Sequence, residues 1–452
     1  MGSVAEAWPI SHVCIIGGGP VGLISSILFR RHGFQVTVLE KNPTREEVGA
    51  GIQLHPNAVR VLQNVGVFER VRKTAIVLPH LLLKAYKTGE TLWDQDFIAD
   101  TKRYGAPLIA LHRTSLQACL YEEALAQGVE IRHGVDVKPA DVDLENGVLR
   151  LSSGEVLHAD LYVGADGGRS AVREALTGRA PQPVPHGRVV MRILIEEKEM
   201  LARPNLRHYA EDGNMVVWLG PDCQVVTYLL DGTFNIAFTW PWSKNPTDAF
   251  MKPQPVDIDA FRAGLVGWHP DLLEMLSLTS GVFQWMFFEP TIDGDEVPWV
   301  DNNSRFVLAG DSAHQFLPYL GQGLAMGYES AALLAALLGK AKTSDQVRDG
   351  LAIYERMRKE RTGLMIRATL RQGRLTQMAD GPLQEARDRE LRESPLPTAG
   401  CPNMMSDPFF QRWMWGFDAE KAADEAWEKY RRSCQSLPEG FVLVPRLRVM
   451  LG

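Results

Sequence analysis

The stretch Cys14-Ile15-Ile16-Gly17-Gly18-Gly19-Pro20-Val21-Gly22-Leu23 decides the fold, because three of its glycines stand at the spacing Gly-x-Gly-x-x-Gly. Such a stretch binds a pyrophosphate when a strand precedes it and a helix follows it, since the amides at the helix start then face the anion. A second apolar run, Val36-Thr37-Val38-Leu39-Glu40, ends in a carboxylate about 20 residues further on, where ribose hydroxyls are bound. We therefore predict a strand-helix-strand unit that binds a dinucleotide through Gly17, Gly19, Gly22 and Glu40.

Two later stretches narrow the choice of dinucleotide. They are Gly164-Ala165-Asp166-Gly167-Gly168-Arg169 and Phe306-Val307-Leu308-Ala309-Gly310-Asp311, and each contains or follows an apolar strand. Because ligands lie at the carboxyl ends of strands in a doubly wound sheet, three such loops can converge on one extended ligand. A glutamate at position 40, with no arginine replacing it, favours FAD or NAD over bound NADP. A nicotinamide enzyme would need only the first loop.

The three loops together resemble those of the single-component (class A) FAD-dependent monooxygenases, which include para-hydroxybenzoate and salicylate hydroxylases and many fungal tailoring enzymes. The resemblance runs from about Val13 to about Ala426. It implies an α/β fold with three parts: a Rossmann-type FAD-binding domain like that of para-hydroxybenzoate hydroxylase, an inserted antiparallel β-sheet substrate domain and a helical C-terminal part. It also implies bound FAD, NADPH or NADH as a transient co-substrate, and O2.

The same resemblance assigns the residues that contact FAD. Glu40 would hold the adenosine ribose, Arg113 would reach the cofactor from the start of a helix, and Asp311 would meet the ribityl chain. The family's Asp-Gly motif matches Asp166, and backbone approaches the cofactor at Ala50 and Gly51. The loop beside the isoalloxazine ring matches Pro318-Tyr319-Leu320-Gly321-Gln322-Gly323-Leu324. Relatives commonly read Ala-Gln-Gly-Ala there, so this chain keeps Gly323 but departs at Gly321 and Leu324, which changes the shape of the loop.

Changes in residue composition along the sequence predict three domains. Short β-branched and aromatic runs separated by Gly-Pro-Asp and Asp-Gly turns fill the middle of the chain and indicate an antiparallel sheet. Aromatic residues there, including Phe234, Phe238, Trp240, Trp285, Phe287 and Phe288, suit either a pocket for a flat ligand or a sheet core, and we expect a mixture. The predicted parts are 1–80, 105–180 and 291–340 for FAD, 81–104 and 181–290 for the substrate, and 341–452 for the helical region.

Arg192 and Tyr228 are the candidate catalytic residues. Strand alternation places Arg192 on one face between Val190 and Leu194, and a guanidinium on an apolar face is costly unless it meets a partner or a ligand. In fungal relatives that the chain resembles, the matching arginine sits over the flavin beside the substrate. An ion pair with Glu196 or Asp222 is the structural alternative. A buried tyrosine is more often core than catalytic, so Tyr228 is the weaker candidate, and Tyr209 competes with it. His314 is expected to shape its loop.

The implied reaction inserts one oxygen atom from O2 into an electron-rich aromatic, heteroaromatic or unsaturated small molecule, in secondary metabolism. Hydroxylation, dearomatisation and epoxidation all fit. An FAD-dependent reductase or dehydrogenase on the same fold, and a scaffold without catalysis, are the alternatives. Since no second Gly-x-Gly-x-x-Gly follows a strand, we expect no separate nicotinamide domain.

Composition excludes several other classes. The net charge of −7 and the absence of a basic cluster argue against nucleic-acid binding. The five cysteines are scattered and lack metal-ligand spacing, so we expect no metal site and a reducing, cytoplasmic setting. No apolar stretch reaches the roughly 18 residues of a membrane span, and no anchor is expected. We expect a monomer or a homodimer.

Overall fold

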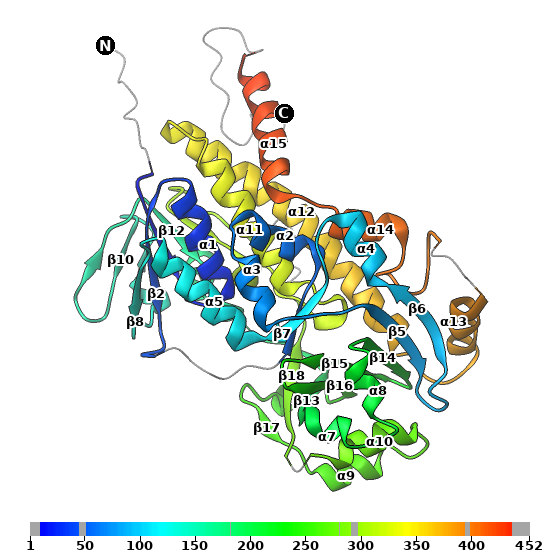
Figure 1. The fold of residues 1–452 in the computed structure, drawn as a ribbon. Helices are drawn as coiled ribbons and strands as arrows, with labels where there is room; N and C mark the ends of the chain where they lie inside the picture. The colour runs from blue at the N-terminus through cyan, green and yellow to red at the C-terminus, as the bar shows by residue number, and fades with distance from the viewer. Residues whose placement is uncertain are drawn as a thin grey trace, which may run out of the picture.

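The computed structural model describes residues 10–44, 51–180, 182–279, 281–290, 297–393 and 398–435, and Figure 1 shows their arrangement. A five-stranded parallel sheet has the strand order β19-β12-β1-β2-β8. Its strands are β1 (His12–Ile16), β2 (Gln35–Glu40), β8 (Glu130–His133), β12 (Leu161–Gly164) and β19 (Phe306–Leu308). Because β12 pairs in parallel with both β1 and β19, the loops that follow these three strands open at the same edge.

Three helices pack in this half of the molecule. Helix α1 (Pro20–Arg31) contacts both α5 (Arg113–Ala126) and α11 (Gly323–Leu338). Proline suits the first position of α1, because an amide there has no partner inside the helix. Residues 325–338 of α11 are all buried, which explains why this helix is mostly apolar on every side, with Glu329 as its one charged residue.

Shorter elements complete the same half. A small antiparallel sheet has the order β3-β7-β4, and a second one has the order β11-β10-β9. The strands are β3 (Gly51–Leu54), β4 (Ile76–Val77), β7 (Ile109–His112), β9 (Val142–Asp143), β10 (Val148–Arg150) and β11 (Val156–Leu157). The helices are α2 (Pro56–Asn64), α3 (Phe68–Val71), α4 (Phe97–Tyr104) and α6 (Ala171–Thr177).

An eight-stranded sheet forms the second large layer, in the order β17-β18-β13-β16-β15-β14-β5-β6. Neighbouring strands are antiparallel except for the parallel pair β5 and β14. The strands are β5 (His80–Ala85), β6 (Thr91–Asp96), β13 (Pro185–Glu196), β14 (Met215–Gly220), β15 (Cys223–Leu230), β16 (Thr233–Pro241), β17 (Gln254–Pro255) and β18 (Phe283–Phe288). Two stretches of chain that lie far apart in the sequence therefore share one sheet.

The two faces of this sheet are covered differently. One face packs on a hydrophobic cluster with short helices, seen at the bottom of Figure 1. These helices are α7 (Glu197–Leu201), α8 (Arg207–Glu211), α9 (Ile258–Ala263) and α10 (Pro270–Ser277). The other face turns toward the parallel sheet and the C-terminal helices, and its apolar residues share a cluster with Met365, Met414 and Trp415.

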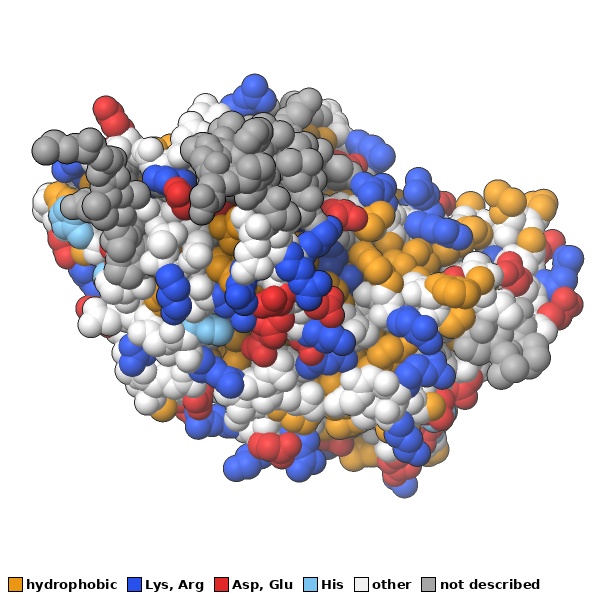
Figure 2. Space-filling view, turned by 90° about the horizontal axis from the view of Figure 1, so that it is seen from above, with side chains coloured by type: hydrophobic (Ala, Val, Ile, Leu, Met, Phe, Trp, Pro, Cys, Tyr) orange, Lys and Arg blue, Asp and Glu red, His pale blue; other side chains and the backbone are white. Residues whose placement is uncertain are grey.

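The C-terminal part is helical, with α12 (Ser344–Thr376), α13 (Pro382–Glu393), α14 (Pro408–Trp415) and α15 (Ala419–Gln435). Of the helices that the structure describes, none has the length and apolarity needed to cross a membrane. On the face shown in Figure 2, lysine and arginine lie among aspartate and glutamate instead of gathering in one patch.

The predicted fold class is confirmed: a Rossmann-type parallel sheet, a separate mostly antiparallel sheet and a helical C-terminal region are all present. Strands β5 and β6 form a hairpin after residue 80, and it joins the large sheet, as the assignment of 81–104 to the substrate part implies. The apolar strand before Asp166 begins at Leu161, and just ahead of it Ala159 donates its backbone amide to the Tyr162 hydroxyl. The exact division into domains stays a prediction.

Candidate active site

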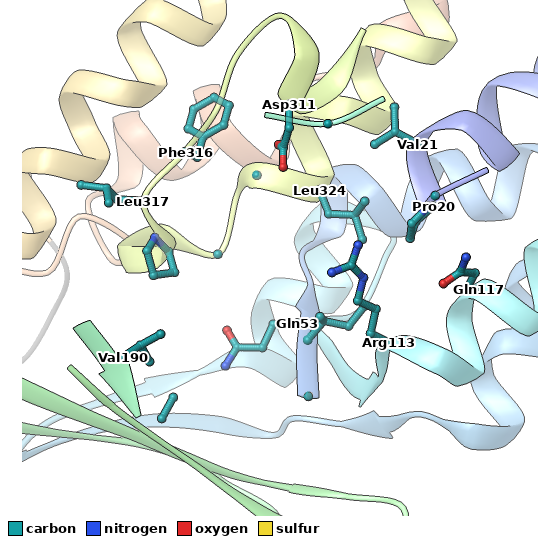
Figure 3. A pocket seen from close by; sticks show the side chains of 18 of the residues that line it. Pro20, Val21, Gln53, Arg113, Gln117, Val190, Asp311, Phe316, Leu317 and Leu324 are labelled. Carbon is teal, nitrogen blue, oxygen red and sulfur yellow. The ribbon is translucent and has the colours of Figure 1, made fainter. Parts of the chain in front are cut away.

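A cavity of about 750 Å³ lies between the carboxyl edge of the parallel sheet and the inner face of the eight-stranded sheet. Figure 3 shows its extent: Pro20 and Gln117 lie toward one end, and Val190 lies on the large sheet at the other. All three loops predicted from the sequence line it, through Gly17 and Gly19, Asp166, and Asp311. The loops therefore converge on one space, as their positions at strand ends predicted.

The glycines of the first loop have different physical reasons to be glycine. A Cβ on Gly22 would lie 1.9 Å from the Gly17 carbonyl oxygen, and one on Gly17 would lie 2.4 Å from that of Ala165. Gly17 also has φ of +108°, which side chains rarely adopt. A Cβ on Gly19 would meet nothing within 4 Å. Gly17 and Gly22 thus let the chain pack on itself, whereas Gly19 borders open space at the start of α1.

Glu40 closes this end of the cavity. Its Oε2 accepts a hydrogen bond from the Gly18 amide at 2.8 Å, and its Oε1 accepts one from the Asn42 amide at 2.9 Å. Each carboxylate oxygen can accept more than one bond, so Glu40 can also receive ribose hydroxyls. The Gly18 contact ties the acid to the glycine loop, which the sequence did not reveal.

Asp311 and Arg113 enter the cavity with Leu324 between them in the view of Figure 3. Burial within the surrounding protein raises the pKa of Asp311, and the nearby Arg113 opposes that shift. Neither side chain makes a hydrogen bond or ion pair with a residue that the structure describes. An acid and a guanidinium that face a cavity without partners suit a ligand that carries hydroxyls and phosphates.

Asp166 has a structural contact as well as a place in the cavity. Its Oδ2 accepts a hydrogen bond from the Ala171 amide at 2.7 Å, which fixes the start of α6. Its Oδ1 is buried and has no partner in the described part of the chain, and burial raises the pKa of this acid. Arg169 is exposed and donates to the Met251 carbonyl oxygen at 3.3 Å.

Gly51, Gly321, Gly323 and Leu324 line the middle of the cavity. Gly321 has φ of +61°, and a Cβ there would lie 2.6 Å from His55 Nε2. The family's usual alanine would be strained at this position, so the departure has a local cause. Ala50 lies outside the residues that the structure describes.

A buried charged network supports this loop from behind, and sequence reasoning missed it. Glu329 on α11 accepts bonds from Arg358 at 2.8 Å and from Arg361 at 2.7 Å. Asn57 donates to both Glu329 and Gln322, at 2.7 and 3.0 Å. Since Gln322 lies between Gly321 and Gly323, the network fixes the loop by its middle residue. The arginines are spaced along α12 like surface residues, so no sequence signal marked them as buried.

Arg192 lies half-buried on the inner face of the large sheet, where its Nη1 donates to the Gly51 carbonyl oxygen at 3.2 Å. The predicted alternative, an ion pair with Glu196 or Asp222, is absent from the described structure. Burial lowers the pKa of the Arg192 guanidinium, and nearby Tyr228 opposes the shift. Burial raises the pKa of Tyr228 to about 12, so the phenol stays protonated at neutral pH.

Tyr228 lies on the same face, and its hydroxyl would be 3.1 Å from a Cβ built on Gly51. Arg192 and Tyr228 therefore meet below Gly51, at the boundary between the two large sheets. Tyr209 faces the other side of the sheet and donates to Asp271 at 3.0 Å, so it does not compete for this place.

Among the described residues in the middle of the chain, Tyr228 is the one aromatic residue that lines the cavity, so the expected mixture of pocket and core aromatics holds only there. None of the six named above lines the cavity, and Phe234 and Phe238 are fully buried in the cluster on the opposite face. His314 is also away from the cavity, bonded to Ser330 Oγ at 2.8 Å, and burial lowers its pKa to about 3. The cavity instead receives residues that no motif indicated: Gln224, Thr239, Gln372, Thr376 and Met405.

The residues present fit FAD. One cavity contains in succession the open space at Gly19, the helix start, the carboxylate of Glu40, and Asp311 and Arg113, which have no partner among the described residues. In the described ranges no three His, Cys, Asp or Glu side chains are grouped as a metal site would require.

Comparison with known proteins agrees with this geometry. Residues 11–242 match the family described as FAD binding domain. The chain is 33% identical to the FAD-dependent monooxygenase OpS4 of Beauveria bassiana (strain ARSEF 2860), over 94% of this chain and 99% of the relative. It is 30% identical to the 3-hydroxybenzoate 6-hydroxylase of Klebsiella oxytoca, over 78% and 85% of the two chains. The crystal structure of CtdE in complex with FAD and substrate 4 has the same fold, with a TM-score of 0.78 at 21% identity over 94% and 100%.

The chain belongs to the class A FAD-dependent aromatic hydroxylase family. It is an FAD-dependent monooxygenase that uses NAD(P)H and O2.

Proposed function

We propose that the enzyme inserts one oxygen atom into an electron-rich aromatic or heteroaromatic substrate that presents a phenol or phenolate to Arg192. The observation that carries the proposal is a guanidinium at the boundary of the two sheets whose one hydrogen bond within the described structure goes to a backbone carbonyl. FAD bound in this cavity, once reduced by NAD(P)H, supplies the chemistry that activates O2. The balance is substrate-H, O2, NAD(P)H and H⁺ to substrate-OH, H2O and NAD(P)⁺.

Arg192 has donors left after its contact with Gly51, because a guanidinium carries five N–H groups. These donors can hold the oxygen of a phenol and stabilise the negative charge that grows on it as the ring attacks. Tyr228 remains protonated, so its hydroxyl can donate to the same oxygen. The apolar residues around them, such as Val217 and Val226, exclude water from the reacting atoms.

The role in secondary metabolism is proposed from the likeness to fungal tailoring enzymes and is supported by the fungal relative. A reducing compartment such as the cytoplasm is supported by the state of the cysteines: all five are free thiols, and four are buried.

The substitution Arg192→Met tests the proposal. A convertible substrate is first identified in a screen of hydroxylated aromatic compounds. Mass spectrometry of the products detects the gain of one oxygen atom. With that substrate, Arg192→Met should form product roughly 10² to 10³ times more slowly, as expected when one preorganised donor is lost. Oxidation of NAD(P)H should continue, with its electrons recovered as hydrogen peroxide. Arg192→Lys should restore little, since an ammonium lacks the planar pair of donors.

Three results would overturn the proposal. Product formation at the parental rate in Arg192→Met would remove the role of the guanidinium. Loss of flavin or easy unfolding of that variant would instead make Arg192 a structural residue. If the parent oxidises NAD(P)H without taking up O2, the alternative of an FAD-dependent reductase or dehydrogenase is favoured.

A further inference from the structure

The inner face of the large sheet can be mapped strand by strand from its register. Arg192 on β13 is opposite Ala237 on β16, which is opposite Val226 on β15. On one side of this row Tyr228 is opposite Asn235, and on the other side Thr239 is opposite Gln224. The row of Ala237 and Val226 therefore separates two polar places on the same face. The Arg192 side chain starts in this row and reaches the first place, because its Nη1 bonds to Gly51, where the Tyr228 hydroxyl also lies.

The second polar place consists of Gln224 and Thr239. The two residues are 6% and 3% exposed, and both line the cavity. Neither side chain makes a hydrogen bond with any residue in the described ranges. Being directly opposite in an antiparallel pair, they have Cβ atoms about 5 Å apart, close enough to share one partner.

The side chains of Gln224 and Thr239 face the cavity, and a ligand that displaces water there must offer them hydrogen bonds, because an unpaired buried amide or hydroxyl is costly. On their own face of β15, the neighbouring residue Val226 is apolar, so it offers no hydrogen bond. Among the described residues of the large sheet and the C-terminal region that line the cavity, Arg192 is the only charged one. A ligand group that meets Gln224 and Thr239 is thus uncharged, and it can both donate and accept.

The distance between the two polar places sets the length of the ligand. Tyr228 and Gln224 are four residues apart on β15, which separates their Cα atoms by about 13 to 14 Å. A single substituted ring held by Arg192 and Tyr228 does not span this distance. A molecule with a second ring or an arm of similar length does.

We propose that Gln224 and Thr239 form a distal recognition site for a neutral hydroxyl, and that the substrate is an elongated phenol with such a group at the end remote from the reacting ring. The proposal rests on the proposed function, because it takes the end at Arg192 as the reacting end. It adds a second anchoring point and excludes single-ring phenols as preferred substrates.

Three probes test the proposal in the oxidised holoenzyme: 4,4′-dihydroxybiphenyl, 4-phenylphenol, which lacks only the far hydroxyl, and phenol. Their dissociation constants are measured from the change in flavin absorbance, without NAD(P)H. The parent should bind 4,4′-dihydroxybiphenyl about tenfold more tightly than 4-phenylphenol, as a hydrogen bond in a buried site implies. It should bind phenol most weakly.

Substitutions then locate the preference. Gln224→Leu and Thr239→Val should each reduce the ratio between the two biphenyls, and the double variant should bring it near one. Thr227→Val is the matched control, because Thr227 lies on the same strand but its hydroxyl is directed to the Val216 carbonyl oxygen, away from the cavity. The control should keep the full ratio.

The proposal fails if the parent binds the two biphenyls equally, if it binds neither more tightly than phenol, or if the ratio survives in the double variant. The parental comparison needs no substitution, so a variant that folds poorly leaves the test intact. Binding is measured without turnover. A protein that shows the preference but takes up no O2 therefore contradicts the proposed function and leaves the distal site standing.

Discussion

The two large sheets carry their parts of the active site in different ways. The parallel sheet presents residues from the loops that follow β1, β12 and β19, so each contribution is a short run of neighbours in the sequence. The eight-stranded sheet presents one face, on which every second residue of a strand points to the cavity and neighbours come from other strands. A loop-borne site can therefore be recognised as a motif, whereas a face-borne site depends on register.

The first prediction concerns the glycine loop after β1, which belongs to the part of the site built from loops, and it has the largest expected effect. Gly22→Ala should abolish FAD binding and destabilise the protein by about 3 kcal/mol or more, because its Cβ would overlap the Gly17 carbonyl oxygen. Gly19→Ala is the control, since its Cβ would meet no protein atom. It should keep the thermal midpoint of the apoprotein and weaken only FAD. Equal midpoints for the two variants would show that backbone packing is not what requires Gly22.

The second prediction separates ligand binding from loop support at Glu40. Glu40→Ala should weaken FAD binding about 10- to 100-fold, since hydrogen bonds to a charged group are lost. Glu40→Gln keeps one acceptor and should lose less, provided that the contact with the Gly18 amide is part of the role. Titration of the apoproteins with FAD measures both. Parental affinity in Glu40→Ala would remove Glu40 from the cofactor site.

The third prediction concerns acid. Among the described residues the two fully buried histidines, His55 and His314, both lie in the FAD-binding half, and burial lowers the pKa of each to about 3. Above the ordinary pKa of 6.5 both are neutral in the folded and unfolded chain, so they add no pH dependence. Below pH 6.5 the two histidines take up protons in the unfolded chain but stay neutral in the folded chain. Each histidine should therefore lower the free energy of unfolding by about 1 kcal/mol at pH 5.5.

Urea unfolding at pH 7.5 and pH 5.5 checks this value. Between the two pH values, the free energy of unfolding should fall less in His314→Gln than in the parent. The difference should equal the contribution of one histidine. An identical loss in parent and variant would mean that His314 is protonated in the folded protein.

The smallest expected effect is on β13 itself. Leu194 shares a face with Arg192 but is 44% exposed and does not line the cavity. Leu194→Thr should change the free energy of unfolding by no more than about 0.5 kcal/mol and leave product formation unchanged. A large loss of product in this variant would show that the functional face extends beyond the cavity as the structure defines it.

The sequence was sufficient for the fold class, the three converging loops and the strand that bears Arg192. It could not show that Gln224 and Thr239 are opposite each other, because register is fixed by packing across strands and not by local pattern. It also could not show that Gln372 and Thr376 reach the cavity, since α12 has no feature that distinguishes its cavity side. Met405 reaches the cavity from the stretch between α13 and α14, which no motif marks. The position of the aromatic residues could not be predicted for a related reason. Aromatic side chains suit a pocket and a core equally, and the alternation of side chains along β16 places Phe234 and Phe238 in the core.

The interleaving of the two sheets also constrains how the chain is made. During synthesis, Leu81 of β5 lacks its partner on β14 until Met215 is made, and Tyr162 of β12 lacks its partner on β19 until Phe306 is made. Until β14 emerges, the nascent chain holds open edges at both β5 and β12, and the edge at β12 stays open until β19 follows. Open edges pair readily with other chains. We therefore expect synthesis of this enzyme to depend on chaperones that shield those edges, and a chain stopped before residue 215 to aggregate because it leaves both edges open.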